Sequence, residues 1–260
     1  ILLVASAFYA YNLVHVGEQK KAQRQKAEKK LLDFIPDDLT KIVVRGGGEK
    51  FTMEKRGKEW FITSPIETKT DSSQIDELIK GVAEGRFVTK VAPSDDMGRF
   101  GLDPPEWEFE FYTSAATPPQ RLAVGSLSPT GRLIYVISSR HDGVIAMGAG
   151  FQYRVRKSIF LLREKRLFDA DPDEIVKLEL VRGDYRLAAS KNKTGAWELV
   201  KPFKAMADAK KIKELISNTV YLKAAGFPSG SVSDDVTGLG SAERIRLWRS
   251  GIEKPLVLSL

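Results

Sequence analysis

Two hexapeptides share a tryptophan followed five residues later by a proline: Trp60-Phe61-Ile62-Thr63-Ser64-Pro65 and Trp197-Glu198-Leu199-Val200-Lys201-Pro202. The two tryptophans lie 137 residues apart, and flanking residues match at the same spacing without a gap. The matches are Val44-Arg45-Gly46 with Val181-Arg182-Gly183, Asp71 with Asp208, Ile75, Leu78 and Ile79 with Ile212, Leu215 and Ile216, and Gly101-Leu102 with Gly238-Leu239. Self-similarity of this length indicates one structural unit used twice, so we expect function to reside in the pair or its shared surface.

Each copy has the pattern of short strands followed by a helix. The triple glycine Gly46-Gly47-Gly48 invites a phosphate-loop interpretation, but no Gly-Lys-Ser/Thr follows and a strand comes next, which favours a hairpin turn. Asp71 and Gln74 form a capping box, in which the glutamine reaches back, ahead of an apolar helical face. Further alternating runs at 108–111, 121–124, 133–137 and 144–147 predict an antiparallel meander.

Composition limits the chemistry. The chain has 260 residues, no cysteine and two histidines, His15 and His141, which lie far apart. Disulfides, thiolate zinc sites and cysteine nucleophiles are therefore excluded. No nucleophile–base pair or set of metal ligands stands out, so we expect no enzyme activity, no catalytic residue, no cofactor and no metal. The net charge of +7 is concentrated largely in one segment.

That segment follows an apolar N-terminus. Residues 1–16 contain no Asp, Glu, Lys or Arg and predict an uncleaved membrane anchor over 1–17, with a signal-peptide core as the other interpretation. Residues 18–35 predict a basic juxtamembrane helical stalk that either contacts anionic lipid or is simply solvated. Small residues in the anchor permit close helix packing. The candidate partner-binding residues are Ala7, Ala10, Tyr11, Lys20 and Arg24.

Three further features suggest ligand sites. Trp60 and Trp197 are expected to pack beneath the helices, with a glycan-stacking platform as the alternative. The basic residues between Arg154 and Arg166 favour a solvated surface over a phosphate site, and without interleaved exposed aromatics they do not indicate nucleic acid. The recurring pairs Asp95-Asp96 and Asp234-Asp235 favour solvated turns over calcium sites. The candidate ligand-binding residues are Trp60, Trp197, Arg154 and Arg156.

These motifs carry a family resemblance. The anchor, the Trp-x4-Pro pattern, the box Phe100-Gly101-Leu102-Asp103-Pro104-Pro105 and the box Arg163-Glu164-Lys165-Arg166-Leu167-Phe168 resemble an uncharacterised bacterial family. It is a membrane-anchored domain of unknown function, commonly encoded beside gliding-motility-type ABC transporter components. The resemblance covers nearly the whole chain and implies a periplasmic body, whereas the positive flank of the anchor alone favours the cytoplasmic side. The second copy lacks the Asp-x-Pro ending at Gly238-Leu239-Gly240.

The sequence therefore predicts an α+β protein with one N-terminal transmembrane helix and two tandem repeats, each a mainly antiparallel sheet with a packed helix. The expected segments are the anchor (1–17), the stalk (18–35), the first repeat (36–170) and the second repeat (171–260). The resemblance implies a non-enzymatic accessory subunit of an ABC-2 type complex in the bacterial inner membrane. Its partners would be the permease, the ATPase, an extracytoplasmic auxiliary subunit and membrane lipid. A periplasmic glycan- or lipid-binding module is the alternative.

Overall fold

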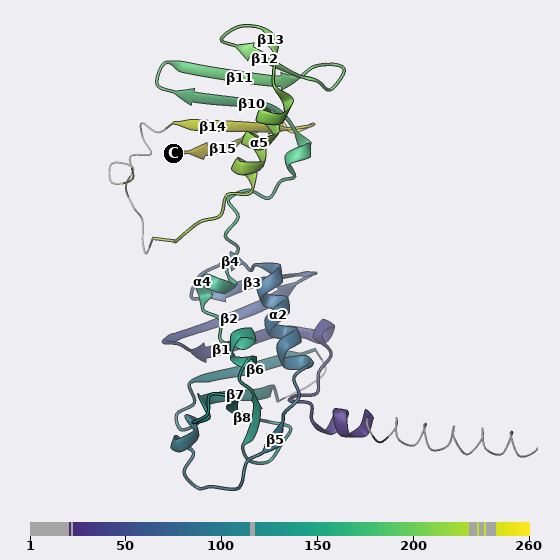
Figure 1. Ribbon diagram of the computed structural model, residues 1–260, viewed down its shortest axis with the longest axis vertical. Coiled ribbons are helices and arrows are strands. Elements are labelled where there is room, and N and C mark those ends of the chain that lie inside the picture. Colours follow the sequence, from purple (N-terminus) through teal and green to yellow (C-terminus); the bar gives the residue numbers. More distant parts are fainter. Residues whose placement is uncertain (1–20, 22, 115–117, 229–232, 234–236, 238–242) are drawn as a thin grey trace, which may run out of the picture. The chain divides into compact units, whose positions relative to one another are not determined.

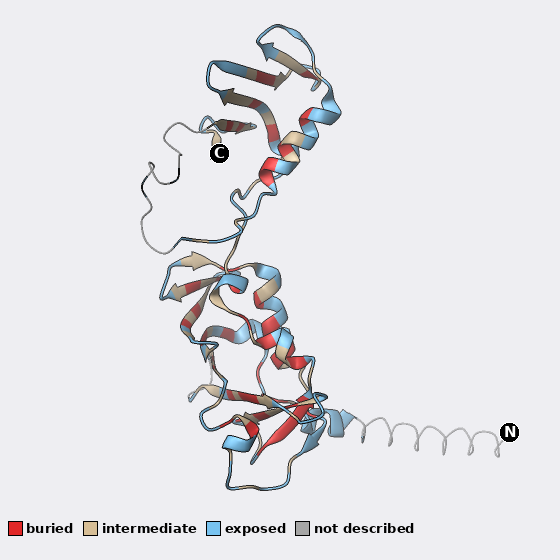
Figure 2. Cartoon of the chain, turned by 60° about the vertical axis from the view of Figure 1, so that its left-hand side comes forward, coloured by how far each residue is buried: buried red, intermediate tan, exposed pale blue. Residues whose placement is uncertain are grey.

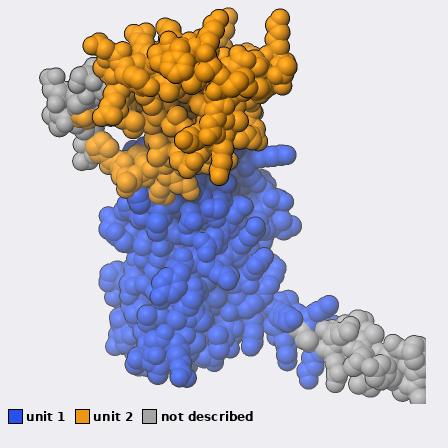
Figure 3. All heavy atoms as spheres, turned by 45° about the horizontal axis from the view of Figure 1, so that its top comes forward, with its two compact units in different colours: residues 1–164 blue, residues 165–260 orange. Residues whose placement is uncertain are grey.

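The computed structural model describes residues 21, 23–114, 118–228, 233, 237 and 243–260 (Figure 1). The protein is α+β, with two antiparallel sheets and a few short helices in two compact units, residues 1–164 and 165–260 (Figure 3). The predicted anchor lies outside the described residues. Within the residues that are described, no helix combines the length and the apolar character that a membrane span requires.

The first unit contains a nine-stranded sheet in the order β4-β3-β2-β1-β6-β7-β8-β9-β5. Its strands are β1 (Leu39–Gly46), β2 (Glu49–Arg56), β3 (Glu59–Ser64), β4 (Thr68–Lys69), β5 (Thr89–Lys90), β6 (Trp107–Thr113), β7 (Gln120–Leu127), β8 (Leu133–Ser138) and β9 (Ile145–Gly148). Its helices are η1 (Pro36–Asp38), α2 (Ser72–Ala83), η2 (Gly98–Phe100), α3 (Phe151–Val155) and α4 (Ile159–Leu162). Every neighbouring pair of strands is antiparallel.

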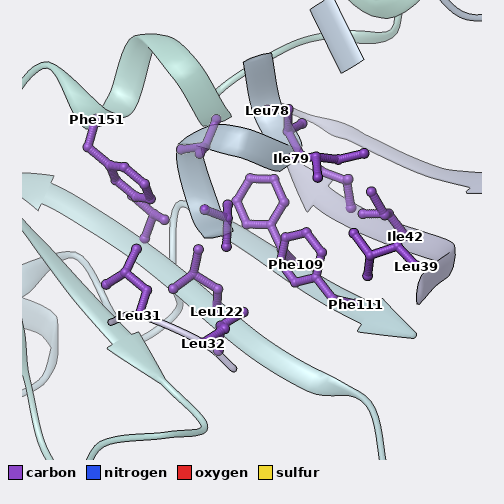
Figure 4. Close-up of a cluster of buried hydrophobic side chains, with 14 of the residues drawn as sticks. Leu31, Leu32, Leu39, Ile42, Leu78, Ile79, Phe109, Phe111, Leu122 and Phe151 are labelled. Carbon is purple, nitrogen blue, oxygen red and sulfur yellow. The ribbon is translucent and has the colours of Figure 1, made fainter. Parts of the chain in front are cut away.

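Helix α2 and the short helices α3 and α4 cover one face of this sheet, where a single hydrophobic core forms (Figures 2 and 4). The α2 side chains Leu78 and Ile79 lie in one cluster with Phe109 and Phe111 of β6. Asp71 caps the helix, because its Oδ1 accepts from the backbone N–H groups of Ser73 and Gln74. The predicted capping box is wrong in its second half, since the Gln74 Oε1 accepts from Lys157 Nζ at 2.7 Å.

The second unit contains a six-stranded sheet in the order β13-β12-β11-β10-β14-β15. Its elements are η3 (Pro172–Glu174), β10 (Ile175–Arg182), β11 (Tyr185–Lys191), β12 (Trp197–Lys201), β13 (Ala205–Met206), α5 (Ala209–Val220), β14 (Arg244–Arg249) and β15 (Leu256–Ser259). Asp208 caps α5 as Asp71 caps α2. The strand order reproduces β4-β3-β2-β1-β6-β7, and the peptide bond before the proline of each Trp-x4-Pro is cis.

The expectation of an ungapped register between the copies is wrong for strands β1 and β10. Val44 pairs with Phe51 and Phe109, and the residue with the equivalent partners, Leu187 and Ile245, is Leu180 rather than Val181. Helices α2 and α5 keep the spacing of 137, whereas β1 and β10 correspond at 136. Strand register is constrained because a slip of one residue would move every side chain to the other face.

A longer turn in the second unit accounts for the shift. Four residues, 56–59, lie between the paired residues Lys55 and Trp60, whereas five residues, 192–196, lie between the equivalent pair Lys191 and Trp197. The Asn192 Oδ1 holds this turn together by accepting from the backbone N–H groups of Thr194 and Ala196 at 2.9 and 3.0 Å. The chain thus changes length in a turn and leaves the strand registers intact.

The end of the first unit is tied to the edge of its sheet. The N–H of Glu164 donates to the Lys69 carbonyl at 2.9 Å, and the N–H of Asp71 donates to the Leu162 carbonyl at 2.8 Å. The compact units accordingly divide between Glu164 and Lys165, whereas the predicted repeats meet at residues 170 and 171.

Candidate functional site

The face of the first sheet opposite α2, here called the open face, carries a cluster of charged side chains over β1, β6 and β7. Side chains alternate along a strand, so Ile42 and Val44 point into the core while Arg45 points the other way. A cavity of about 470 Å³ lies among these groups. Its lining residues are Arg45, Glu108, Phe109, Glu110, Arg121, Leu122, Ala123, Ile137, Ser138 and Ser139.

Glu110 is the centre of the cluster, with only 16% of its side chain exposed. Arg45 Nη1 lies 3.5 Å from Glu110 Oε1, and Arg121 Nε lies 3.7 Å from the same oxygen. The Tyr112 hydroxyl donates to Glu110 Oε2 at 2.8 Å. Glu108 adds a second carboxylate, 3.7 Å from Arg45 Nη1. Cations and an O–H donor therefore surround one carboxylate from three strands.

This arrangement shifts two pKa values. The Tyr112 hydrogen bond, with help from Arg45 and Arg121 and against partial burial, holds the pKa of Glu110 below its ordinary 4.5. The same bond to the carboxylate raises the pKa of Tyr112 above its ordinary 10.0. A carboxylate with a lowered pKa is a weak proton acceptor. The cluster is therefore suited to recognising a charged group by exchange of ion pairs, and poorly suited to moving protons.

The box at Phe100-Gly101-Leu102 forms a wall beside this cavity. Phe100 and Leu102 pack in a small cluster with Ala123 and Ile137, which also line the cavity. The box lies directly on β7, because a Cβ built on Gly125 would be 2.1 Å from the Phe100 carbonyl oxygen. The first-copy box therefore has a structural role next to the open-face cluster.

The open face of the second sheet repeats one element of this surface. Lys177 lies over the Trp248 ring at 4.3 Å, and at the equivalent cross-strand position Lys41 lies over the Tyr112 ring at 5.5 Å. Sequence reasoning missed both pairs and the Glu110 cluster. The signal that could have found them is the alternation along β1 and β6, which places charged residues opposite the apolar ones.

The predicted ligand-binding residues differ in their local surroundings. Trp60 and Trp197 are 7% and 5% exposed and pack in the cores of different units, so neither offers an exposed ring face for stacking. Trp60 does border a groove of about 540 Å³. Arg154 is exposed on α3, whereas Arg156 donates to the Gly125 carbonyl and pairs with Glu106 Oε2 at 2.9 Å. Arg156 thus ties the end of α3 to the region beneath the box.

The predicted partner-binding residues Ala7, Ala10, Tyr11 and Lys20 lie outside the described residues. Arg24 is exposed on the helical stretch 23–28. Of the repeated acidic pairs, Asp234-Asp235 also lies outside the described residues, while Asp96 Oδ1 accepts from the Arg99 N–H at 3.2 Å. Across the residues that the structure describes, no group of three His, Cys, Asp or Glu side chains is placed to hold a metal ion.

The hydrogen bond between Tyr112 and Glu110 gives an expected pH profile. The contribution of Glu110 to the free energy of unfolding should be complete above pH 4.5. It should be lost as pH falls through the lower pKa that Glu110 has in the folded protein. The contribution of Tyr112 to the free energy of unfolding should be complete below pH 10.0. It should be lost as pH rises through the higher pKa that Tyr112 has in the folded protein. The stability difference between wild type and Tyr112→Phe should therefore be flat between these limits and shrink beyond both.

Urea unfolding of the two proteins across this pH range measures that difference. Tyr135→Phe is the matched control: Tyr135 packs edge-on against Phe100, and among the described residues its hydroxyl makes no hydrogen bond to a carboxylate, so its loss should show no such profile. A Tyr112→Phe difference that stays constant from acid to alkaline pH would contradict the assignment.

The chain matches one family of known proteins. The DUF4340 family, described as a domain of unknown function, matches residues 60–239, a stretch that includes both Trp-x4-Pro copies and the part of the open-face cluster on β6 and β7. No curated protein and no solved structure matches the chain. Because the match spans well over half of the sequence, the chain belongs to the DUF4340 family of proteins of unknown function.

Proposed function

We propose that the protein is a non-enzymatic, single-pass accessory subunit of a bacterial ABC-2 type, gliding-motility-like transport complex, anchored in the inner membrane with its body in the periplasm. The uncharged residues 1–16 support the anchor, and the sequence resemblance supports the partnership with a permease and an ATPase. The two sheets support a tandem repeat, because the second sheet reproduces the strand order β4-β3-β2-β1-β6-β7 of the first.

One structural observation carries the proposal: the stalk is docked on the body. Leu31 and Leu32 are 0% and 1% exposed and belong to the core of the first unit. The N–H of Leu31 donates to the Gly85 carbonyl at 3.2 Å, and the N–H of Phe87 donates to the Lys29 carbonyl at 3.0 Å. A flexible tether would need none of these contacts, so the docking suits a body that is held in a set position above an anchor.

The open face supplies the surface for a periplasmic partner. Arg45, Glu108 and Arg121 present charges of both signs around a cavity, which favours specific pairing with a complementary protein surface. In this proposal the anchor residues Ala7 and Ala10 contact permease helices, and the open-face cluster contacts the extracytoplasmic auxiliary subunit. Tyr11, Lys20 and Arg24 would contact lipid and the permease at the membrane surface.

The test is a mild-detergent pull-down of the full-length tagged protein from native membranes, with partners identified by mass spectrometry. Permease and ATPase should be recovered with wild type and reduced with the variant Ala7→Leu/Ala10→Leu, because the larger side chains would block close helix packing. Leu3→Val/Leu13→Val is the matched control, since it keeps the anchor apolar and fills no small position. Recovery of the protein alone would refute the transport-complex proposal.

The burial of both tryptophans weakens the alternative of a glycan-binding module. Acrylamide quenching of the tryptophan fluorescence would have to show exposed rings at Trp60 or Trp197 for that alternative to stand.

A further inference from the structure

A second cavity, here called the junction cavity, lies where the stalk meets the body of the first unit. Its volume is about 670 Å³. The lining residues are Gln25, Glu28, Lys29, Phe87, Lys90, Arg140 and His141. Four of these side chains are basic and one is acidic, although they come from the stalk, from β5 and from the turn after β8. The fold thus gathers positive charge at one point from three separate parts of the sequence.

Two of the basic groups are held in fixed orientations. Arg140 Nη1 pairs with Asp33 Oδ2 at 3.2 Å, and its Nη2 donates to the Ala27 carbonyl at 3.3 Å. The His141 Nε2 donates to the Lys30 carbonyl at 2.6 Å, since a carbonyl can only accept. The imidazole also packs edge-on against Phe87, with ring centroids 5.0 Å apart. These contacts prepare the wall of the cavity before any ligand arrives.

Lys29 and Lys90 supply the uncommitted charge. Both side chains are exposed, and among the described residues neither takes part in an ion pair. Two free ammonium groups beside an oriented guanidinium match the charge and the several acceptor oxygens of a phosphate group. Glu28 is the one carboxylate in the lining, and it limits the net charge without neutralising the site.

The junction cavity also lies close in sequence to the predicted anchor. The apolar run ends at Val16, and Gln25 follows nine residues later, about 14 Å along the continuous helix that the sequence predicts. The headgroup layer is about 7 Å deep on each side of the bilayer. It would end before the cavity, and the remaining gap is roughly the length of one lysine side chain. We propose that the junction cavity binds a phosphate group, either that of an anionic lipid headgroup or that of a soluble phosphate, through Lys29, Lys90 and Arg140, with His141 as part of its wall. The site does not depend on the transport partnership.

The experiment compares the full chain with Lys29→Gln/Lys90→Gln, whose positions are exposed and should not affect folding. Lys193→Gln/Lys210→Gln removes the same charge from exposed positions in the second unit and serves as the control. In one arm, native mass spectrometry measures phosphatidylglycerol retained from nanodiscs of phosphatidylcholine and phosphatidylglycerol. In the other, calorimetry in phosphatidylcholine nanodiscs measures binding of inorganic phosphate.

The cavity variant should retain phosphatidylglycerol roughly 30-fold less well than wild type, which corresponds to about 1 kcal/mol for each lysine near a membrane surface. The control should behave as wild type. Loss confined to the lipid arm assigns the site to a headgroup, and loss of inorganic phosphate binding assigns it to a soluble anion. If the cavity variant matches the control in both arms, or wild type binds neither probe, the proposal is overturned, whatever the pull-down has shown.

Discussion

Replacing Gly125 by alanine should destabilise the first unit by about 3 kcal/mol, at the upper end of the usual cost of overpacking. The added Cβ would lie 2.1 Å from the Phe100 carbonyl oxygen and 2.9 Å from the Gly101 carbonyl oxygen. Both are backbone atoms, so no side-chain rotation relieves the clash. The box must move away from β7, and the wall that it forms beside the open-face cavity must move with it.

Hydrogen exchange of the β7 amides in the full chain would report this loss specifically for the first unit. Gly148→Ala is the matched control, because a Cβ at this position would meet no described atom within 4 Å beyond its chain neighbours, and its φ is not positive. Equal exchange in the two variants would show that the box does not press on β7 as described.

Leu31→Ala should lower the free energy of unfolding by about 3 kcal/mol. It should also release the stalk from the body. Leu31 is completely buried among core residues, and its N–H donates to the Gly85 carbonyl. Truncating the side chain leaves a cavity at the junction. The paired amides of Leu31 and Phe87 should then exchange faster, and trypsin should cleave faster after Lys29 and Lys30.

Ile35→Ala provides the comparison, because Ile35 lies four residues away but is 63% exposed. This substitution should change the free energy of unfolding by no more than about 0.5 kcal/mol, as for most surface substitutions. If both variants left the cleavage rate at the wild-type value, the stalk would be held by something other than the buried leucine. The docking that supports the proposed function would then lose its basis.

The two long helices could be predicted from the sequence because their signals are local. Asp71 and Asp208 each precede an apolar pattern of helical period, and each caps a helix of twelve residues in the structure. The Trp-x4-Pro pattern covers β3 and β12 and the proline that follows each strand, and the spacing of 137 is preserved there. Capping geometry and period need only residues within one or two turns of each other.

The strand correspondence could not be predicted in the same way. The identity of Val44-Arg45-Gly46 with Val181-Arg182-Gly183 suggests one alignment, but the cross-strand partners of Val44 show that Leu180 is its equivalent. A similar residue one position away can match a sequence while pointing to the wrong face of a sheet. Only the length of the turn at 192–196, seen in the structure, resolves the difference.

The candidate sites were missed because their members meet only through the strand order. Tyr112 reaches Glu110 along one strand, but Arg45 joins them because β1 pairs with β6. Likewise, Arg140 and His141 face the stalk because the turn after β8 meets the backbone of residues 27 to 30. Such contacts depend on topology, which no window of the sequence contains.

The two-residue strands at both ends of the first sheet have a consequence for how the protein behaves when crowded. A long, flat outer strand would offer a row of unpaired backbone groups to a neighbouring molecule and seed aggregation. Here β4 and β5 each end in an exposed or half-exposed lysine, Lys69 and Lys90, and the Lys69 carbonyl already accepts from Glu164. Broad as it is, the sheet is thereby kept from pairing edge to edge with the sheet of a neighbouring molecule, even at high protein concentration.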